Sequence, residues 1–256
     1  MDYSLVALDM DGTLLTDQKS ISDRNLRALK KALRKGLHVV LATARTVWSA
    51  RACLPEPDMP LGVVACNGAE VWLPGGREPL VCEPIPPDVA AALVRCDRPG
   101  ALQVKLYPPE RIHRSLERPE LFDRFHSPGA EPGVPGPLLQ VVFTGPDDQV
   151  RAFWAELEER YRHVLTFTTS EPGRLEITRH GVSKVTGLAR LAQALGVPGE
   201  RVVAMGNGAN DLPMLEWAGL GFAMANAPEE VRRRVGRIAP RHDEDGVAQV
   251  IEALLQ

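Results

Sequence analysis

Two carboxylic acids stand one residue apart near the start of the chain, in the segment Asp9-Met10-Asp11-Gly12-Thr13. Carboxylates this close repel each other, so they need a shared proton or a bound cation. A hard divalent ion such as Mg²⁺ prefers oxygen ligands of this kind. Gly12 lets the backbone turn tightly away from the pair. The segment therefore predicts a Mg²⁺ site; the simpler alternative is a turn whose acids cap the next helix.

A second segment, Ala42-Thr43-Ala44-Arg45, ends a predicted strand. A hydroxyl group and exposed N–H groups at a strand end suit the equatorial oxygens of a phosphoryl group. A threonine in this place also commonly caps a helix. Its position after Asp9 in an α/β pattern favours the phosphate-binding interpretation.

Two further segments lie in the last third of the chain. Lys184 stands at the start of a predicted helix, where an ammonium group is unfavourable unless an anion lies nearby. The alternative for Lys184 is an ordinary solvated lysine. The segment Gly206-Asn207-Gly208-Ala209-Asn210-Asp211 follows a predicted strand, and its glycines permit close approach of the backbone to a metal–phosphate cluster.

The elements that must position these residues follow an α/β pattern. Apolar residues 4–8 are typical of a buried strand. A helix is predicted from the cap Ser22 to the stop Gly36, and a second strand follows at residues 37–42. This crossover is long enough for a parallel sheet. The C-terminal block repeats the pattern, with strands predicted at residues 201–205 and 220–224 and helices at 184–195, 212–218, 228–235 and 247–255.

All four segments thus fall at the carboxyl ends of predicted strands or at a helix start. Ligands collect at this edge of an open parallel sheet. The middle of the chain differs, because it holds most of the prolines, strand candidates at residues 138–144 and 174–178, and one amphipathic helix marked by Phe153, Leu157 and Tyr161. Residues 127–137 have no periodicity and predict an exposed loop. We expect an α+β module inserted into an α/β domain.

The ordered motifs resemble those of the haloacid dehalogenase superfamily, in particular its Cof-type subfamily. The first motif of that family is D-x-D-G-T, and Asp9 and Asp11 match its acids. The resemblance implies that Asp9 attacks phosphorus and forms an aspartyl-phosphate. It also implies that Asp11 protonates the leaving oxygen and then activates water. Further Cof-type matches are Leu212-Pro213-Met214-Leu215, Cys66-Asn67-Gly68-Ala69, Ala225-Asn226-Ala227 and residues 243–248.

The same resemblance assigns the remaining site residues and the domains. It implies an α/β, Rossmann-like parallel-sheet core from residues 1–82 and 180–256, with residues 83–179 inserted as an α+β cap that governs substrate choice. Thr43 and Lys184 join the two acids as catalytic residues. The expected Mg²⁺ ligands are Asp9, Asp11, Asn207 and Asp211, and the expected phosphate-binding residues are Gly12, Thr43, Ala44, Arg45, Asn67, Lys184 and Asn210. Candidate substrate contacts in the cap are Lys105, Tyr107, Arg111, His113, Arg174 and Glu176.

One position departs from the family pattern. Asn207 stands where the family usually has a metal-binding aspartate. An amide oxygen still coordinates Mg²⁺, but the site holds one negative charge less. We therefore expect weaker Mg²⁺ affinity, with Asp9, Asp11 and Asp211 as the principal anionic support.

Composition excludes several classes of function. A net charge of −3 gives no basic field for nucleic acid or an anionic membrane. The four cysteines form no C-x-x-C pair, which argues against a thiolate zinc site or a disulfide framework. No apolar run approaches the length of a membrane span, and the first residues carry no basic leader. We expect a cytoplasmic enzyme, monomeric or homodimeric, whose partner is a small phosphorylated metabolite.

The expected reaction is Mg²⁺-dependent hydrolysis of a small phosphomonoester, with sugar phosphates as the leading class by resemblance. A phosphotransferase or mutase on the same core is a first alternative. A weakly active phosphometabolite sensor is a second, and Asn207 is the feature that favours it.

Overall fold

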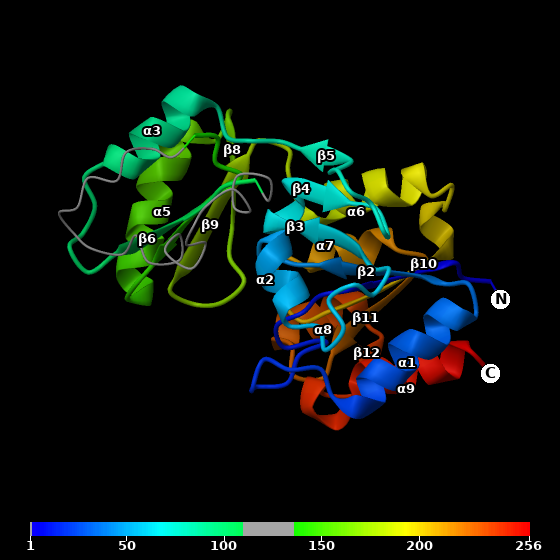
Figure 1. Cartoon of the computed structure of the whole chain (residues 1–256). Helices are drawn as coiled ribbons and strands as arrows, with labels where there is room; N and C mark the ends of the chain where they lie inside the picture. Colours follow the sequence, from blue (N-terminus) through cyan, green and yellow to red (C-terminus); the bar gives the residue numbers. More distant parts are fainter. Residues whose placement is uncertain (1, 110–135) are drawn as a thin grey trace. The chain divides into compact units, whose positions relative to one another are not determined.

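The structure is a computed structural model, and it describes residues 2–109 and 136–256. The chain forms two compact units (Figure 1). The first unit joins both ends of the chain, Met1–Val81 and Lys184–Gln256, and the second unit is Cys82–Ser183. Each unit has its own hydrophobic core.

The larger sheet has the strand order β12-β11-β10-β1-β2-β3-β4-β5 among the described residues. The strands from β12 to β3 are parallel to their neighbours, whereas β4 pairs with β3 in the antiparallel sense. The predicted α/β fold with a Rossmann-like parallel core is therefore confirmed. The strands are β1 (Leu5–Leu8), β2 (His38–Ala42), β3 (Gly62–Ala65), β4 (Glu70–Trp72), β5 (Val81–Cys82), β10 (Val202–Gly206), β11 (Leu220–Met224) and β12 (Ile238–Ala239).

Helices cover both faces of this sheet (Figure 1). Because successive side chains of a strand point to opposite faces, Val6 and Leu8 join one cluster while Leu5 and Ala7 join the other. Burial on both faces explains the continuous apolar runs of these strands. The first face carries α1 (Asp23–Arg34), α2 (Val47–Ala52) and α9 (Gly246–Leu254); the second carries α6 (Lys184–Ala194), α7 (Leu212–Trp217) and α8 (Glu229–Val235).

Local sequence signals predict several element boundaries closely. The hydroxyl of Ser22 accepts a hydrogen bond from the N–H of Asn25 at 3.1 Å and caps α1, as predicted. The strand predicted at residues 220–224 has those bounds. The strands predicted at 4–8 and 37–42 begin one residue later, and the one predicted at 201–205 spans Val202–Gly206. The short helix α2 was not predicted, because six residues capped by Thr46 carry little periodic signal.

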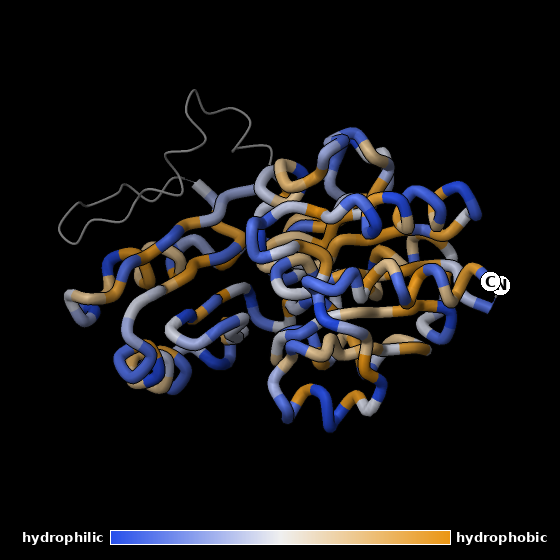
Figure 2. The backbone as a smooth tube through the Cα atoms, turned by 90° about the horizontal axis from the view of Figure 1, so that it is seen from below, coloured by the Kyte–Doolittle hydropathy of each residue, from blue (hydrophilic) through white to orange (hydrophobic). Residues whose placement is uncertain are grey.

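The second unit has an antiparallel sheet with the strand order β6-β7-β9-β8. Phe143 on this sheet meets Phe153 on α5 edge to face, with ring centroids 5.0 Å apart. In Figure 2 the hydrophobic stretches run through the interior of each unit and the outer turns are mostly hydrophilic. The elements are α3 (Pro87–Arg95), β6 (Gln103–Tyr107), β7 (Gln140–Thr144), α5 (Asp147–Tyr161), β8 (Leu165–Thr168) and β9 (Arg174–Arg179).

The predicted exposed loop at residues 127–137 lies almost wholly outside the described residues. Within the described part of the chain, no helix is both long enough and apolar enough to cross a membrane.

Candidate active site

Three neighbouring strands of the larger sheet, β10, β1 and β2, end side by side and bring the predicted segments together. Asp9 follows β1, and its N–H donates to the carbonyl of Met205 on β10 at 2.9 Å. Thr43 follows β2, and Asn207 follows β10. The carboxyl ends of parallel strands meet at one edge, so residues about 200 positions apart in the chain become neighbours.

Lys184 lies between two buried carboxylates. Its Nζ donates to Asp9 Oδ1 at 2.7 Å and to Asp211 Oδ1 at 2.6 Å. The side chain of Lys184 is only 2% exposed, and that of Asp211 only 1%. Removing such an ammonium from water is costly unless anions pair with it, and here two do. The anion that the sequence required beside this helix start is therefore present within the protein itself.

The three charges do not balance, because one ammonium faces two carboxylates. Burial, together with the charge of Asp211, raises the pKa of Asp9 from its ordinary value to about 7, against the lowering effect of Lys184. Burial alone would lower the pKa of Lys184, but the charges of Asp211 and Asp9 outweigh it and raise that pKa. The site thus retains an excess negative charge that a cation would neutralise.

Asp211 organises the loop that carries it. Its Oδ2 accepts hydrogen bonds from the N–H groups of Asn207 at 2.9 Å and Gly208 at 2.8 Å, while its Oδ1 holds Lys184. Both oxygens are thus occupied by protein donors. In this arrangement Asp211 orients Lys184 and the Asn207 loop, and its predicted role as a Mg²⁺ ligand stays a prediction.

Asp11 is held by two cations. Arg45 donates to it through Nε at 2.6 Å and Nη2 at 2.8 Å, and Lys19 donates through Nζ at 2.7 Å. Burial would raise the pKa of Asp11, but the hydrogen bonds from Arg45 and Lys19 outweigh it and hold that pKa well below its usual range. The guanidinium also reaches Ser49 Oγ and Cys53 Sγ, both at 3.3 Å. Arg45, predicted as a phosphate ligand, thus clamps Asp11 in this structure.

The side-chain amide of Asn207 faces Asp9 and Asp11. One of its outer atoms lies 3.2 Å from Asp9 Oδ2 and 2.9 Å from the carbonyl oxygen of Asp11. With nitrogen in this place, the amide donates to both oxygens. With oxygen there, Thr13 Oγ1 donates to it at 3.2 Å and three oxygens converge without a hydrogen between them. A half-turn of the amide exchanges the two states.

The state in which the Asn207 amide oxygen faces Asp9 Oδ2 and the Asp11 carbonyl oxygen fits a magnesium ion. Octahedral Mg²⁺–oxygen distances of about 2.1 Å place adjacent ligands about 3.0 Å apart, close to the spacings around Asn207. The fit depends on one carboxylate, one amide and one main-chain carbonyl. Within residues 2–109 and 136–256, no group of three or more His, Cys, Asp or Glu side chains is arranged to hold a metal ion.

Gly12 is required where it stands. Its φ is +77°, in the left-handed region that favours glycine. A Cβ atom at this position would lie 2.5 Å from Asn207 Nδ2. Any larger residue would therefore displace the Asn207 amide and disturb the convergence of oxygens around it.

The remaining predicted phosphate-binding residues line the loops after β2 and β3. Thr43 is buried, its Oγ1 accepts from the N–H of Arg45 at 3.2 Å, and its carbonyl accepts from the N–H of Asn67 at 3.0 Å. Ala44 lies between Thr43 and Arg45 in the same loop. Asn67, which has a φ of +53°, accepts a hydrogen bond from Asn210 Nδ2 at 3.3 Å. The loops after β2, β3 and β10 are thereby tied together.

The cap candidates belong to the second unit. Arg174 Nε donates to Glu176 Oε1 at 2.6 Å, and the carboxylate of Glu176 is fully buried. Both residues of this ion pair belong to the second unit. Arg111 and His113 lie outside the described residues. Substrate contacts by any side chain of this unit stay a prediction.

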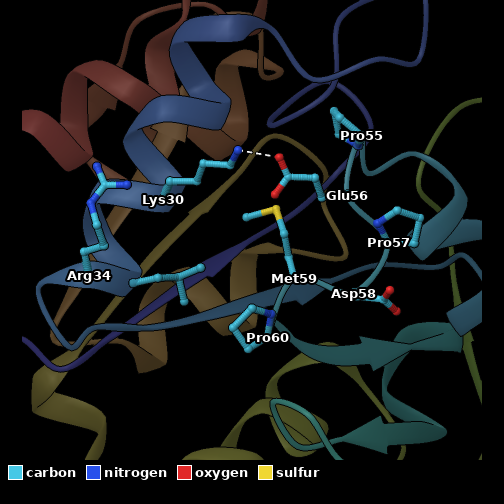
Figure 3. A pocket seen from close by; sticks show the side chains of 9 residues that line it. Lys30, Arg34, Pro55, Glu56, Pro57, Asp58, Met59 and Pro60 are labelled. Carbon is cyan, nitrogen blue, oxygen red and sulfur yellow. Dashed lines mark hydrogen bonds and ion pairs between the residues drawn. The ribbon is translucent and has the colours of Figure 1, made fainter.

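A separate pocket of about 710 Å³ lies elsewhere in the first unit (Figure 3). It is formed by the end of α1, which leads into β2, and by residues 55–60, which lead into β3. Both segments lie at the amino-terminal edge of the parallel strands, opposite the edge that carries Asp9. Lys30 and Glu56 form an ion pair across it. None of the predicted site residues lines this pocket.

Two residues near the site were missed from the sequence. Lys19 contacts Asp11, and no spacing rule indicates a lysine eight residues further along a loop. Asn226 donates to the carbonyl of Gly12 at 2.8 Å. The Ala225-Asn226-Ala227 segment was recognised as a family match, and that match was the signal that could have pointed to a role at the site.

Comparison with known proteins identifies the family of the chain. A model of the haloacid dehalogenase-like hydrolase family matches residues 6–113 and 134–251. The chain belongs to this family, and its predicted membership is confirmed. Among solved structures, it is similar to a haloacid dehalogenase-like hydrolase from Bacteroides thetaiotaomicron, with 28% identity, a TM-score of 0.81, and coverage of 98% of this chain and 99% of that one.

Curated relatives narrow the class to phosphatases. The chain is 31% identical, over 98% of its own length and 95% of the relative's, to the 5-amino-6-(5-phospho-D-ribitylamino)uracil phosphatase YcsE of Bacillus subtilis. It is 29% identical, over 98% and 99%, to the phosphatase YwpJ of the same organism. The protein is a phosphoric monoester hydrolase, which confirms the predicted enzyme class.

Proposed function

We propose that the protein hydrolyses a small phosphomonoester with Asp9 as nucleophile. The Asp9 carboxylate attacks phosphorus, the ester P–O bond breaks, and Asp11 gives its proton to the leaving oxygen. Asp11 then takes a proton from water, whose oxygen attacks the aspartyl-phosphate and releases inorganic phosphate. The observation that carries this proposal is the buried Asp9, held by Lys184 and facing Asn207 at the end of β1.

The role of Asp11 requires a change in its partners. Both oxygens of Asp11 accept hydrogen bonds from Arg45 or Lys19 in the substrate-free protein. A phosphate ester brings two negative charges, which compete with Asp11 for these cations. Transfer of Arg45 toward the phosphoryl oxygens would release Asp11 to carry a proton. This proposal reconciles the predicted phosphate-binding role of Arg45 with its observed position.

The residues present fit a magnesium ion held by Asp9 Oδ2, the carbonyl oxygen of Asp11 and the amide oxygen of Asn207. When bound, the ion supplies positive charge that offsets the charge on the phosphoryl group and on Asp9. Lys184 supplies a second positive charge, and Asp211 keeps Lys184 in place. The neutral amide of Asn207 is the reason for expecting a weaker hold on the ion.

The other predicted phosphate ligands complete the proposal. Thr43 offers its hydroxyl, while Gly12 and Ala44 offer main-chain N–H groups at the same edge of the sheet. Asn67 and Asn210, hydrogen-bonded to each other, orient the phosphoryl group or its neighbours. The second unit, Cys82–Ser183, acts as the cap that selects the substrate. We place the enzyme in the cytoplasm as a monomer or homodimer, without nucleic-acid or membrane partners.

The proposed substrate is a phosphorylated sugar or sugar alcohol. The name of the Bacillus subtilis relative YcsE specifies 5-amino-6-(5-phospho-D-ribitylamino)uracil, which carries its phosphate on a ribityl chain. Three other curated relatives carry the same substrate in their names. This compound is therefore the first to test beside simple sugar phosphates, nucleotides and pyridoxal phosphate.

The decisive experiment measures phosphate release from this panel with Mg²⁺ or EDTA, in ¹⁸O-labelled water. We expect Mg²⁺-dependent release of phosphate that contains one solvent oxygen, and loss of release in Asp9→Asn. Phosphate transferred to a sugar hydroxyl without solvent oxygen would instead show a phosphotransferase or mutase. Tight binding of a phosphorylated compound without turnover would show a sensor, the candidate that Asn207 favours.

A further inference from the structure

Asn226 links the C-terminal part of the first unit to the acid–base segment. It follows β11, and its Nδ2 donates to the carbonyl oxygen of Gly12 at 2.8 Å. Its Oδ1 accepts from the main-chain N–H of His242 at 3.2 Å. One side chain thus joins two loops, and the proposed mechanism gives it no role.

The Gly12 turn is confined from two directions. On one side its α-carbon faces the Asn207 amide so closely that a Cβ atom would collide with it. On the other side Asn226 holds its carbonyl oxygen. The Gly12–Thr13 peptide is joined through the Gly12 α-carbon to the Asp11–Gly12 peptide, which carries the Asp11 carbonyl. Holding the first peptide therefore restrains where the Asp11 carbonyl points and where the Thr13 hydroxyl lies. The Asp11 carbonyl and the Thr13 hydroxyl both contact the Asn207 amide.

His242 reinforces this link from the other end of the same loop. Its ring Nε2 lies 2.9 Å from Asp17 Oδ1, six residues after Asp11. The ring is buried, and within the described part of the chain its Nδ1 has no hydrogen-bond partner. Asn226 and His242 therefore hold the segment from Gly12 to Asp17 at two points.

We propose that Asn226 is a positioning residue for phosphoryl transfer. By fixing the Gly12–Thr13 peptide, it keeps the carbonyl oxygen of Asp11 directed toward Asp9 Oδ2 and the Asn207 amide, and it keeps the Asp11 side chain in line with the phosphorus that Asp9 attacks. It contacts neither substrate nor metal. This inference rests on the proposed function, because it assigns Asn226 to the machinery of that same site.

The chain offers a matched control in Asn25. Its Nδ2 also donates to a carbonyl of this loop, that of Leu14 at 3.5 Å, and its Oδ1 also accepts a main-chain N–H, that of Ala248 at 2.9 Å. Asn25 thus makes the same kind of link two residues further from Asp11. A purely structural link would respond alike at both positions.

The experiment compares Asn226→Asp and Asn226→Ala with Asn25→Asp and Asn25→Ala. Asn226→Asp keeps the acceptor for His242 and loses the donor to Gly12, and the alanine variants serve if an aspartate prevents folding. The measurements are kcat and KM with p-nitrophenyl phosphate, the melting temperature, and the Mg²⁺ midpoint. This midpoint is the Mg²⁺ concentration that half-saturates the protein, measured by calorimetry with Mg²⁺ alone. The kinetic and calorimetric measurements are made at a temperature where all the proteins are folded.

For the Asn226 variants we expect kcat to fall by about 10- to 100-fold while KM changes by less than about twofold. We also expect the Mg²⁺ midpoint to rise by about tenfold, because the Asp11 carbonyl loses its orientation. The Asn25 variants should lose stability with kcat within about threefold of the wild type. The inference would be overturned if, for an equal loss of melting temperature, the Asn226 and Asn25 variants showed equal changes in kcat and in the Mg²⁺ midpoint.

The two proposals fail differently. If the wild-type protein releases no phosphate, the proposed function is wrong. The Mg²⁺ midpoint then still decides whether Asn226 orients the Asp11 carbonyl, since this calorimetric measurement requires no turnover. An unchanged midpoint in Asn226→Asp and Asn226→Ala would reject that role.

Discussion

Restoring an acidic residue at position 207 tests the electrostatic account of the site. In the metal-free protein, the substitution Asn207→Asp places a carboxylate oxygen where the amide now lies, 3.2 Å from Asp9 Oδ2. At an effective dielectric constant of about 20, two unit charges at that distance repel by about 5 kcal/mol. Proton uptake and small movements relieve part of this repulsion, and we expect a net loss of about 2 kcal/mol in the free energy of unfolding.

For a chain of this size, such a loss lowers the melting temperature in EDTA by about 4 to 8 °C. A bound Mg²⁺ ion reverses the sign of the effect, because it turns two repelling charges into two ligands. We expect the Mg²⁺ midpoint to fall at least tenfold, which corresponds to about 1.4 kcal/mol of additional stabilisation at a fixed Mg²⁺ concentration. Asn207→Ala, which lacks an oxygen ligand, should show the opposite shift in midpoint.

Calorimetric titration with Mg²⁺ and melting curves in EDTA and in Mg²⁺ measure both quantities. Gln193→Glu is the control for added charge, since it lies exposed on α6 nine residues beyond Lys184, about 13 Å along the helix axis. Its Mg²⁺ midpoint should stay within about twofold of the wild type. An Asn207→Asp protein with an unchanged midpoint, or with greater stability in EDTA, would refute the reasoning.

Two further predictions follow from the charges around Asp9. Lys184→Met leaves the buried carboxylates of Asp9 and Asp211 unpaired. Thermal melting in EDTA should therefore show a loss of about 3–5 kcal/mol in the free energy of unfolding. A change in melting temperature below about 2 °C would contradict the pairing. Because the pKa of Asp9 is raised to about 7, the folded protein holds a proton between about pH 4 and 7 that the unfolded chain has lost; stability in EDTA should therefore fall as pH rises through this window. Urea unfolding at pH 5 and pH 8 measures the sign of this change in the free energy of unfolding. Saturating Mg²⁺ should reduce the dependence of that free energy on pH. An equal pH dependence with and without the ion would contradict the role of Asp9.

The fold was largely predictable because its signals are local. Buried parallel strands are continuous apolar runs, and Ser22 and Gly36 mark the ends of a helix by their own chemistry. The crossovers between these strands are long enough to make neighbouring strands parallel. The meeting of Asp9, Thr43 and Asn207 needed only the rule that such strands end at one edge.

The partners of the acids could not be predicted in the same way. Lys19 reaches Asp11 only because the intervening loop returns on itself, with a φ of +59° at Lys19. The sequence motif likewise groups Asp211 with the metal ligands. It does not predict that the oxygens of Asp211 accept hydrogen bonds from Lys184 and from two N–H groups, because these bonds depend on atomic positions to within less than an ångström. Pattern and spacing carry no information at that scale.

The central claim is that Asp9 forms a covalent bond to phosphorus. The most direct test quenches the enzyme in acid during turnover of a phosphorylated substrate with Mg²⁺ and locates the phosphoryl group by peptide mass spectrometry. We predict an acid-stable, hydroxylamine-sensitive phosphoryl group on Asp9, absent from Asp9→Asn, which releases no phosphate. A phosphoryl group on another residue, or an Asp9→Asn protein with wild-type turnover, would contradict the account.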